Sequence, residues 1–511
     1  MNIAHHVERG CRFFPHKSAL LFEGRSFSYK ELNQLANRVA NGLGGLGIKR
    51  GDRVALFLPN IPEFIISYLG ILKIGAVVVS VNVMLKSGEV KFILNNCAAK
   101  VLITTAALLE NVPDEELPDL RHIVIAAGNS TIINLEQLMF SASPEAQALE
   151  LGRDEPAAIV YTSGTTGFPK GATLSHGNVI SNIYSKNRCC RMRSEERLLL
   201  YLPLFHCFGQ NAILNAGLNA CATIILQQRF EPEQVLRSIA SDAITMFFGV
   251  PTVFIKLLHT NLSNYDMSSV RYYFSAAAPM PIEVGRQWQE KLGLPIHEGY
   301  GLTETSPFAC YNHDFKYKLG SVGTPIENVE VKVVNAEGME VLPGELGEIV
   351  ISGPNVMLGY WNRPLETAQV LTNGWLHTGD IGMMDDDGYF YIVDRLKDTI
   401  NLSGFKVYPT EVENLIYTHP AVAEVAVYGT PDLIKGETVK ADILLKTGFM
   451  LTEQDIITFC SERMATYKVP RTVRFVNAIP KSATGKVLKR LLRETAVTTK
   501  ETVFPQSLMS S

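Results

Sequence analysis

Ala76 to Val83, with the sequence AVVVSVNV, is the stretch that most restricts the fold of this chain. A continuous run of β-branched residues is typical of a strand buried on both faces, as in a parallel sheet covered by helices. A helix is expected just before it, from Pro62 to Leu72, and a second helix-to-strand step follows through VKFILNNC into KVLITT. This alternation predicts an α/β architecture built of layered subdomains.

The pattern of hydrophobic residues and turn residues changes from Asn328 onward. Short alternating strands, VEVKVV, GEIVIS and GYFYIVD, are separated by Gly and Pro turns, which predicts a β-rich part over residues 328–395. A boundary near Asp394–Asp398 precedes a compact segment of helices and strands. We therefore expect a large N-terminal domain over residues 1–395 and a small α+β domain over residues 396–511.

Composition excludes several classes of protein. With 46% hydrophobic and 19% charged residues, the 511-residue chain is an ordinary globular protein. Its net charge is −4 and it has no basic run, so nucleic acid is not an expected partner. Eight cysteines without CxxC spacing indicate reduced thiols in the cytoplasm. No secretory signal is expected, and the uncharged segment Leu198 to Gln228 is too polar for a transmembrane segment, so it is expected to be buried core or pocket wall.

A loop rich in glycine and hydroxyl side chains, YTSGTTGFPKG (Tyr161 to Gly171), follows the apolar run Ala157 to Val160. Glycines let backbone N–H groups converge on an anion, hydroxyls add donors, and Lys170 supplies a positive charge. Helical spacing from Leu174, with Ser175 as N-cap, places the loop between a strand and a helix. The spacing is not that of a Walker A loop. On its own, the loop fits an anion cradle and a mobile surface loop equally well.

Three further residues suit the same kind of ligand. Glu304, in a Gly-rich turn, could bind a magnesium ion that phosphates already hold. Asp380, in WLHTGD, could accept hydrogen bonds from ribose hydroxyls, and Lys486 could be a mobile cation. Each also has an ordinary interpretation, as a helix N-terminal acid, a turn residue and a solvated charge respectively.

Taken together, these segments resemble the adenylate-forming superfamily: acyl-CoA synthetases, adenylation domains of peptide synthetases, and firefly-type luciferases. The resemblance covers almost the whole chain and is closest in motif to fatty acyl-CoA synthetases. Its motifs occur in family order: YTSGTTGFPKG, PLFHCFG, FFGVP, GYGLTE, WLHTGD, DRLKD, SGFKVYPTEVE and PKSATGK. Eight ordered motifs make chance agreement negligible.

The resemblance implies a two-step reaction. A carboxylate attacks the α-phosphate of ATP, which gives an acyl adenylate and pyrophosphate. A thiol, that of coenzyme A or of a carrier protein's phosphopantetheine, then displaces AMP to form a thioester. The implied ligands are ATP, Mg²⁺, coenzyme A or carrier-protein phosphopantetheine, and a small-molecule carboxylic acid; an acyl carrier protein would be the macromolecular partner.

The resemblance also assigns residues to the nucleotide and to coenzyme A. These residues are Thr162, Ser163, Gly164, Thr165, Thr166, Gly167, Lys170, Ala277, Tyr300, Gly301, Thr303, Asp380, Arg395, Ser403, Gly404, Phe405 and Lys406. The first loop would hold the β- and γ-phosphates. Glu304 would bind Mg²⁺, and Lys486 would bridge the attacking carboxylate and the α-phosphate.

Other roles follow from the same resemblance. Thr303 would contact the α-phosphate, and Tyr300 would stack on adenine beside the backbone near Ala277. Asp380 and Arg395 would hold the ribose. The turns at Ala277 and Gly301 would help to choose the acid.

Lys397 falls at the position of the family's hinge, about which the small domain rotates between the two half-reactions. One arrangement would bring in Lys486, and the other would bring Ser403 to Lys406 toward the large domain to shape the thiol tunnel. Without the resemblance, Lys397 would be interpreted as an ordinary surface lysine.

The uncharged segment bears on the identity of the acid. Leu198 to Gln228 offers no carboxylate for a substrate ammonium, which disfavours α-amino acids. His206 matches the gate of carboxylate-activating relatives or is a buried core histidine. The SGF-x-VYP pattern resembles fatty acyl-CoA synthetases, so a fatty or other hydrophobic acid is the leading hypothesis. Asn211, Asn215 and Asn219 would share one helical face, where they bond to backbone groups of the core or touch a polar substituent of the acid.

Three other functions stay open at this point. An acyl-acyl-carrier-protein ligase would share every motif with a coenzyme A ligase. A non-catalytic protein that binds nucleotide or acyl chains is disfavoured by the retained Lys486, Glu304, Asp380 and Arg395. A luciferase is a remote alternative, because the motifs alone do not encode light emission.

Overall fold

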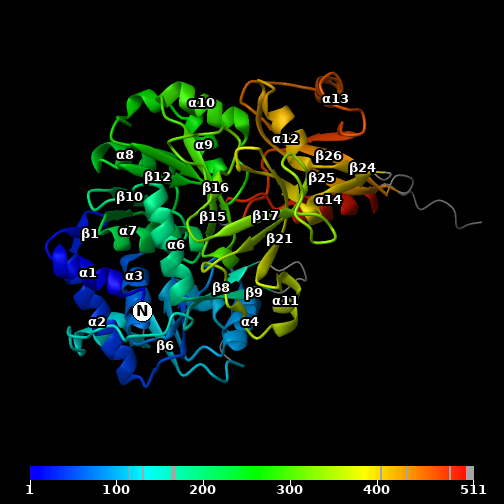
Figure 1. Cartoon of the computed structure of the whole chain (residues 1–511). Coiled ribbons are helices and arrows are strands. Elements are labelled where there is room, and N and C mark those ends of the chain that lie inside the picture. Colours follow the sequence, from blue (N-terminus) through cyan, green and yellow to red (C-terminus); the bar gives the residue numbers. More distant parts are fainter. Residues whose placement is uncertain are drawn as a thin grey trace, which may run out of the picture.

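The structure is a computed structural model that describes residues 1–113, 116–128, 132–162, 169–402, 405–432, 436–482 and 485–501, with side chains to residue 495. Residues 163–168 of the glycine- and hydroxyl-rich loop (the anion loop), and Ser403 and Gly404 of the SGFK segment (the second loop), lie outside the described residues. Figure 1 shows helices and strands mixed along the whole chain, which confirms the expected α/β architecture.

The first large sheet has eight strands in the order β19-β9-β8-β4-β3-β5-β6-β7. They are β3 (Arg53–Phe57), β4 (Val77–Ser80), β5 (Val101–Thr105), β6 (His122–Ala127), β7 (Ile133–Asn134), β8 (Pro156–Thr162), β9 (Lys170–Ser175) and β19 (Gly359–Tyr360). The β-branched run forms β4, which is fully buried between its parallel neighbours β3 and β8, as the sequence predicts.

The second large sheet has nine strands in the order β16-β15-β14-β13-β12-β10-β11-β1-β2. They are β1 (Ser18–Phe22), β2 (Arg25–Ser28), β10 (Arg197–Leu200), β11 (Thr223–Leu226), β12 (Met246–Gly249), β13 (Tyr272–Ser275), β14 (Ile296–Gly301), β15 (Phe308–Tyr311) and β16 (Thr324–Pro325). β10, β12, β13 and β14 are consecutive parallel neighbours. Because their carboxyl ends meet at one edge, the turns that follow them are brought together, and this is where open α/β sheets bind ligands.

Helices cover these two sheets. They are α1 (His5–Phe13), α2 (Tyr29–Gly45), α3 (Pro62–Lys73), α4 (Ser87–Cys97), α5 (Leu135–Phe140), α6 (His176–Cys189), α7 (Ala216–Ala220), α8 (Pro232–Ser241), α9 (Pro251–Leu258) and α10 (Ile282–Leu292). Between β10 and α7 lies a π-helix, η2 (Phe208–Asn215), whose residues are all buried. π-Helical turns are rare and often accompany functional sites.

The predicted strands after Asn328 are present as a third, antiparallel sheet. It contains β17 (Glu330–Val334), β18 (Gly347–Ser352), β20 (Leu371–Thr372), β21 (Trp375–Met384) and β22 (Phe390–Arg395), with α11 (Pro364–Val370) beside it. The short helical turn η5 (Leu396–Asp398) leads out of β22.

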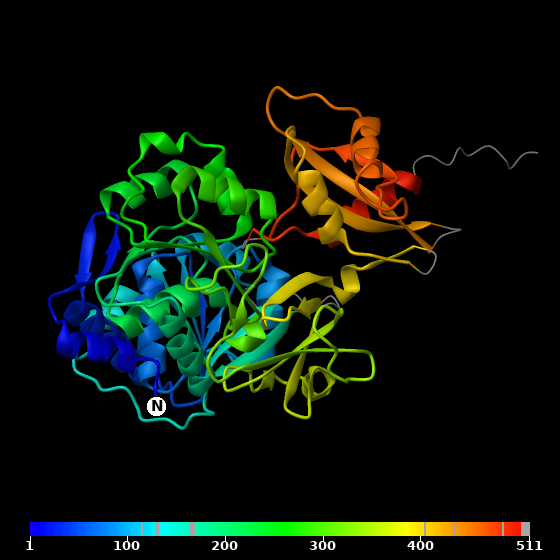
Figure 2. The same cartoon turned by 45° about the horizontal axis from the view of Figure 1, so that its top comes forward.

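The C-terminal part has its own sheet and its own buried core. Its strands are β23 (Ile400–Leu402), β24 (Phe405–Val407), β25 (Val422–Asp432), β26 (Gly436–Leu445) and β27 (Thr472–Phe475), and its helices are α12 (Pro409–Tyr417), α13 (Glu453–Ser461) and α14 (Lys489–Glu501). One hydrophobic cluster joins residues from Ile3 to Phe390, and a separate one joins residues from Ile400 to Val473. Figure 2 shows this part, in orange and red, as a distinct body beside the green part of the chain. The boundary at residue 395 stays a prediction.

One local expectation is wrong. The anion loop does not pass directly from a strand into a helix, because Lys170–Ser175 forms β9, which pairs antiparallel with β8. Leu174 therefore belongs to a strand. Ser175 is the N-cap of α6, as expected, and its side chain accepts a hydrogen bond from the backbone N–H of Asn178.

Candidate active site

A buried carboxylate, Asp380 on β21, lies at the centre of the predicted site residues. The Tyr300 hydroxyl donates to its Oδ2 over 2.7 Å, and Arg395 Nε lies 3.0 Å from its Oδ1. Asp380 and Arg395 face each other across the β21–β22 ladder, and Tyr300 comes from β14 of the nine-stranded sheet. Two elements distant in sequence therefore fix one carboxylate, and three predicted ribose and adenine residues are brought together.

Lys486, from the C-terminal part, lies half-buried beside this group. Its pKa is lowered to about 8, chiefly by burial and then by the positive charge of Arg395, while the negative charge of Asp380 acts in the opposite direction. Lys397 on η5 is exposed, and its pKa is also lowered, by partial desolvation and then by the charge of Arg395. The structure thus brings Lys486 close to Asp380, although the sequence predicts that these two residues belong to different domains.

Gly485 explains how the Lys486 loop comes so close to the large domain. Its φ is +79°, which disfavours any residue with a Cβ. A Cβ atom there would lie 2.6 Å from Thr252 Oγ1 and 3.0 Å from Val250 Cγ2, at the junction of β12 and α9. The loop therefore packs against the FFGVP motif, at the edge where the parallel strands end.

His206 lies half-buried in the turn after β10, near Lys486. Burial and then the charge of Lys486 lower the pKa of His206 to about 4. Its Nδ1 accepts a hydrogen bond from the backbone N–H of Phe208 over 3.2 Å. The imidazole is therefore neutral near pH 7 and carries its proton on Nε2.

Thr303 and Glu304 follow β14 and lie beside the His206 segment. The Thr303 side chain hydrogen-bonds the thiol of Cys207, whose pKa burial raises to about 12. Tyr360, on β19, donates its hydroxyl to Glu304 Oε1 over 2.7 Å. Lys170 Nζ lies 5.2 Å from the centre of the Tyr360 ring. Glu304 and Lys170 are therefore connected through Tyr360.

Sequence reasoning missed Tyr360. It lies outside all eight motifs, and its position depends on the pairing of β19 with β9, which the local sequence does not encode. The one local signal is the aromatic pair Tyr360–Trp361 between a glycine and an asparagine.

The turn after β13 carries Ala277, whose φ of +73° is unusual for a residue with a Cβ. Glu298 supports this turn, because its Oε2 accepts from the backbone N–H of Met280 over 3.4 Å. Burial raises the pKa of Glu298 to about 8.

Three other predicted site residues lie apart from the group around Asp380 and Lys486. Thr162 pairs with Lys170 in the β8–β9 ladder at the described end of the anion loop. Phe405 and Lys406 are exposed on β24, where the Phe405 ring stacks on Tyr467 at 4.9 Å between centroids. The structure therefore has Lys486, rather than this part of the second loop, at the site.

The three asparagines differ from expectation in their partners. Asn215 Nδ2 donates to the Tyr68 hydroxyl over 2.7 Å and to Asn211 Oδ1 over 2.9 Å, and Asn187 Nδ2 donates to Asn219 Oδ1 over 3.0 Å. These bonds go to side chains, where we expected backbone partners.

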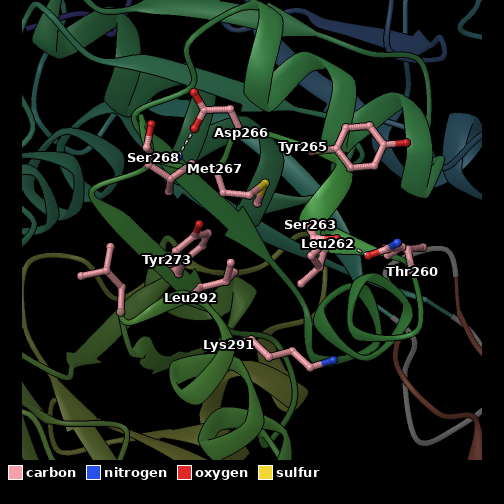
Figure 3. A pocket seen from close by; sticks show the side chains of 13 residues that line it. Thr260, Leu262, Ser263, Tyr265, Asp266, Met267, Ser268, Tyr273, Lys291 and Leu292 are labelled. Carbon is pink, nitrogen blue, oxygen red and sulfur yellow. Dashed lines mark hydrogen bonds between the residues drawn. The ribbon is translucent and has the colours of Figure 1, made fainter.

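A separate surface pocket of about 610 Å³ lies between the α9–β13 connection and the end of α10 (Figure 3). Its walls include Thr260, Tyr265, Tyr273 and Lys291, and no predicted site residue lines it. Within the described residues, no helix is long and apolar enough to cross a membrane.

Comparison with known proteins defines the class. Residues 7–361 match the AMP-binding enzyme family, and residues 411–486 match the AMP-binding enzyme C-terminal domain. The chain belongs to the AMP-binding enzyme family of adenylate-forming acyl-CoA ligases. It is an AMP-forming acid–CoA ligase, and enzymes of this class use ATP and coenzyme A.

Individual relatives act on different acids. A long-chain-fatty-acid–CoA ligase of Bacillus subtilis (strain 168) is 36% identical over 94% of this chain and 92% of its own length. A feruloyl-CoA synthase of an Amycolatopsis species is 37% identical, covering 95% and 97%. The crystal structure of the anthranilate CoA ligase AuaEII with anthranoyl-AMP has a TM-score of 0.93 at 31% identity and covers 98% of each chain.

Gly485→Ala should slow adenylate formation by about 10- to 100-fold, because the new methyl group meets Thr252 and the backbone is strained. The measurement is ATP–pyrophosphate exchange. Gly448→Ala is the matched control, since Gly448 also has a positive φ (+87°) but no atom within 4 Å of a Cβ. Adding Thr252→Ala to Gly485→Ala should restore part of the rate. Equal effects of the Gly485 and Gly448 substitutions would contradict the packing described above.

Proposed function

We propose that the protein activates a hydrophobic carboxylic acid with ATP and transfers the acyl group to the thiol of coenzyme A. In the first step, a carboxylate oxygen bonds to the α-phosphorus and the bond to pyrophosphate breaks. In the second, the thiol sulfur bonds to the acyl carbon and the bond to AMP breaks. The proposal rests above all on Lys486 of the C-terminal part lying beside Asp380 and Arg395.

Lys486 supplies a positive charge where negative charge gathers in the first step. A cation between the attacking carboxylate and the α-phosphate offsets their mutual repulsion, and such chemistry needs mainly positioning and charge neutralisation. Thr303 would contact the α-phosphate, and Thr162 and Lys170 the β- and γ-phosphates. His206, neutral and with a proton on Nε2, would act as a hydrogen-bond donor at the carboxylate.

Nucleotide binding would use the Asp380 group. Its carboxylate is oriented by Tyr300 and Arg395 and would accept from the ribose hydroxyls, while the Tyr300 ring and the backbone near Ala277 and Gly301 would face adenine. Asp380 is buried, so its bonds to the ribose would be shielded from water.

Glu304 is the residue we propose for Mg²⁺. Its carboxylate is a hard oxygen ligand, it is oriented by Tyr360, and Mg²⁺ commonly combines one or two carboxylates with substrate phosphates. When bound, the ion would neutralise part of the charge of the triphosphate.

The class of acid is inferred from the uncharged segment. Leu198 to Gln228 contains no acid, and η2 within it is buried, so a substrate ammonium would find no carboxylate there. Relatives named for long-chain fatty acids and for ferulate support a hydrophobic acid. We propose a fatty or aryl acid, and a cytoplasmic location because all eight cysteines are free.

Pyrophosphate release should depend on the acid supplied. Fatty and aryl acids should release pyrophosphate at rates at least about 10-fold above those of α-amino acids of similar size, since an unpaired buried ammonium costs several kcal/mol. Coenzyme A and a holo acyl carrier protein are then compared as acceptors by mass spectrometry. Thioester on coenzyme A is the expected product, whereas thioester on the carrier protein alone would replace the proposal with an acyl-carrier-protein ligase.

Single substitutions should affect one half-reaction and spare the other. Lys486→Ala should lower adenylate formation by about 100-fold or more, as for loss of a buried charge-stabilising group, and largely spare thioester formation from supplied acyl adenylate. Lys397→Pro at the hinge should spare pyrophosphate exchange and block thioester formation. Each half-reaction is assayed alone. Equal loss of both in the Lys486 variant, or loss of exchange in the Lys397 variant, would contradict the assigned roles.

A further inference from the structure

The surface pocket beside the α9–β13 connection (Figure 3) has an apolar floor. Leu262, Met267 and Val270 are buried members of the large hydrophobic core, and Leu292 packs against the same core. Because these side chains belong to the core, the fold itself holds the floor in place. The volume of about 610 Å³ lies within the range of small-molecule sites, about 300 to 1,000 Å³.

Tyr273, on β13, lines this pocket with a hydroxyl group that has no hydrogen-bond partner among the described residues. The side chain is almost fully buried, and its ring packs edge-to-face on Trp288, with 5.1 Å between ring centres. Burial raises the pKa of Tyr273, so the phenol stays neutral and can donate or accept a hydrogen bond. Because buried polar groups are nearly always paired, an oxygen atom of a ligand would complete this hydroxyl.

Lys291, near the end of α10, is the one cationic side chain among the described residues that line the pocket, and Asp266 is the one acidic side chain. Lys291 is exposed, and its Nζ lies 3.5 Å from the carbonyl oxygen of Leu258, which is longer than an ordinary hydrogen bond. Asp266 Oδ1 already accepts from the backbone N–H of Ser268 over 2.9 Å. Lys291 can therefore take an anion, whereas Asp266 is engaged within its own turn.

The pocket is separate from the reaction centre, although the two share elements. α9 begins beside Thr252, where the Lys486 loop packs, and ends just before Thr260 of the pocket. Eight helical residues span about 12 Å. Likewise, Tyr273 lies near the start of β13, whereas the Ala277 turn follows its end. The pocket and the reaction centre therefore lie at opposite ends of α9 and β13.

We propose that this pocket is a second ligand site, which binds a small hydroxyaryl carboxylate. The carboxylate pairs with Lys291, and the phenol oxygen bonds to the Tyr273 hydroxyl at the floor. The ring lies on Leu262, Met267 and Leu292, because a thioether and aliphatic side chains make favourable contacts with an aromatic body. The inference goes beyond the proposed function and does not rest on it, since none of these residues takes part in the reaction proposed above.

Equilibrium dialysis of the full chain tests this with three probes: 4-hydroxyphenylacetate, phenylacetate, which lacks the phenol oxygen, and 4-methylphenol, which lacks the carboxylate. A stable sulfamoyl mimic of an acyl adenylate fills the reaction centre during the measurement. One molecule of 4-hydroxyphenylacetate should bind per chain, about 3- to 10-fold more tightly than either partial probe, as expected for one hydrogen bond or one exposed ion pair. No binding, or three equal dissociation constants, overturns the inference. Failure of the mimic to bind would count against the proposed function alone, because the probes still report on the pocket.

Substitutions then assign each preference to a side chain. Tyr273→Phe removes only the hydroxyl, so 4-hydroxyphenylacetate and phenylacetate should bind equally, while the preference for a carboxylate stays. Lys291→Met, at an exposed position that leaves the core intact, should have the converse effect. Lys256→Met is the matched control, because Lys256 is exposed on α9 but does not line the pocket, and it should leave all three dissociation constants unchanged. Preferences that persist in both the Tyr273 and the Lys291 variants would mean that the probes bind elsewhere, which would overturn the inference.

Discussion

The fixed carboxylate of Asp380 is the interaction on which the rest of the site depends. Tyr300 and Arg395 orient it from two different sheets, and its negative charge partly offsets the cost of desolvating Lys486. A buried ammonium otherwise loses its hydration without compensation. The Asp380 carboxylate therefore favours the position of the C-terminal part in which Lys486 lies beside it.

Charge balance around Asp380 explains why the site suits a polyanion. Desolvation and then the charge of Arg395 lower the pKa of both Lys397 and Lys486, and the charge of Lys397 also lowers the pKa of Lys486. A triphosphate would relieve that repulsion and stabilise the protonated lysines. Removing pyrophosphate would reverse part of this effect, which gives a physical reason for the closed arrangement to loosen after the first step.

Much of this arrangement could be predicted from the sequence because it is local. The β-branched run gave β4 correctly, and the motifs that follow β10, β12, β13 and β14 meet because parallel strands end at one edge. Two features were not predicted from the sequence. The bond from Tyr360 to Glu304 requires β19 to pair with β9, which is distant in sequence. The β8–β9 hairpin is local, but the spacing of apolar residues from Leu174 was interpreted as helical.

The most direct test of the split site is the pKa of Lys486 itself, measured by competitive acylation of its amine across pH, with peptide mass spectrometry to read each lysine. Burial beside Arg395 predicts a value of about 8 without nucleotide, against an ordinary value of 10.5. Lys406, exposed on β24, is the internal reference for an unburied amine. A value for Lys486 that matches this reference would contradict the account, because the lysine would then not be buried against the large domain.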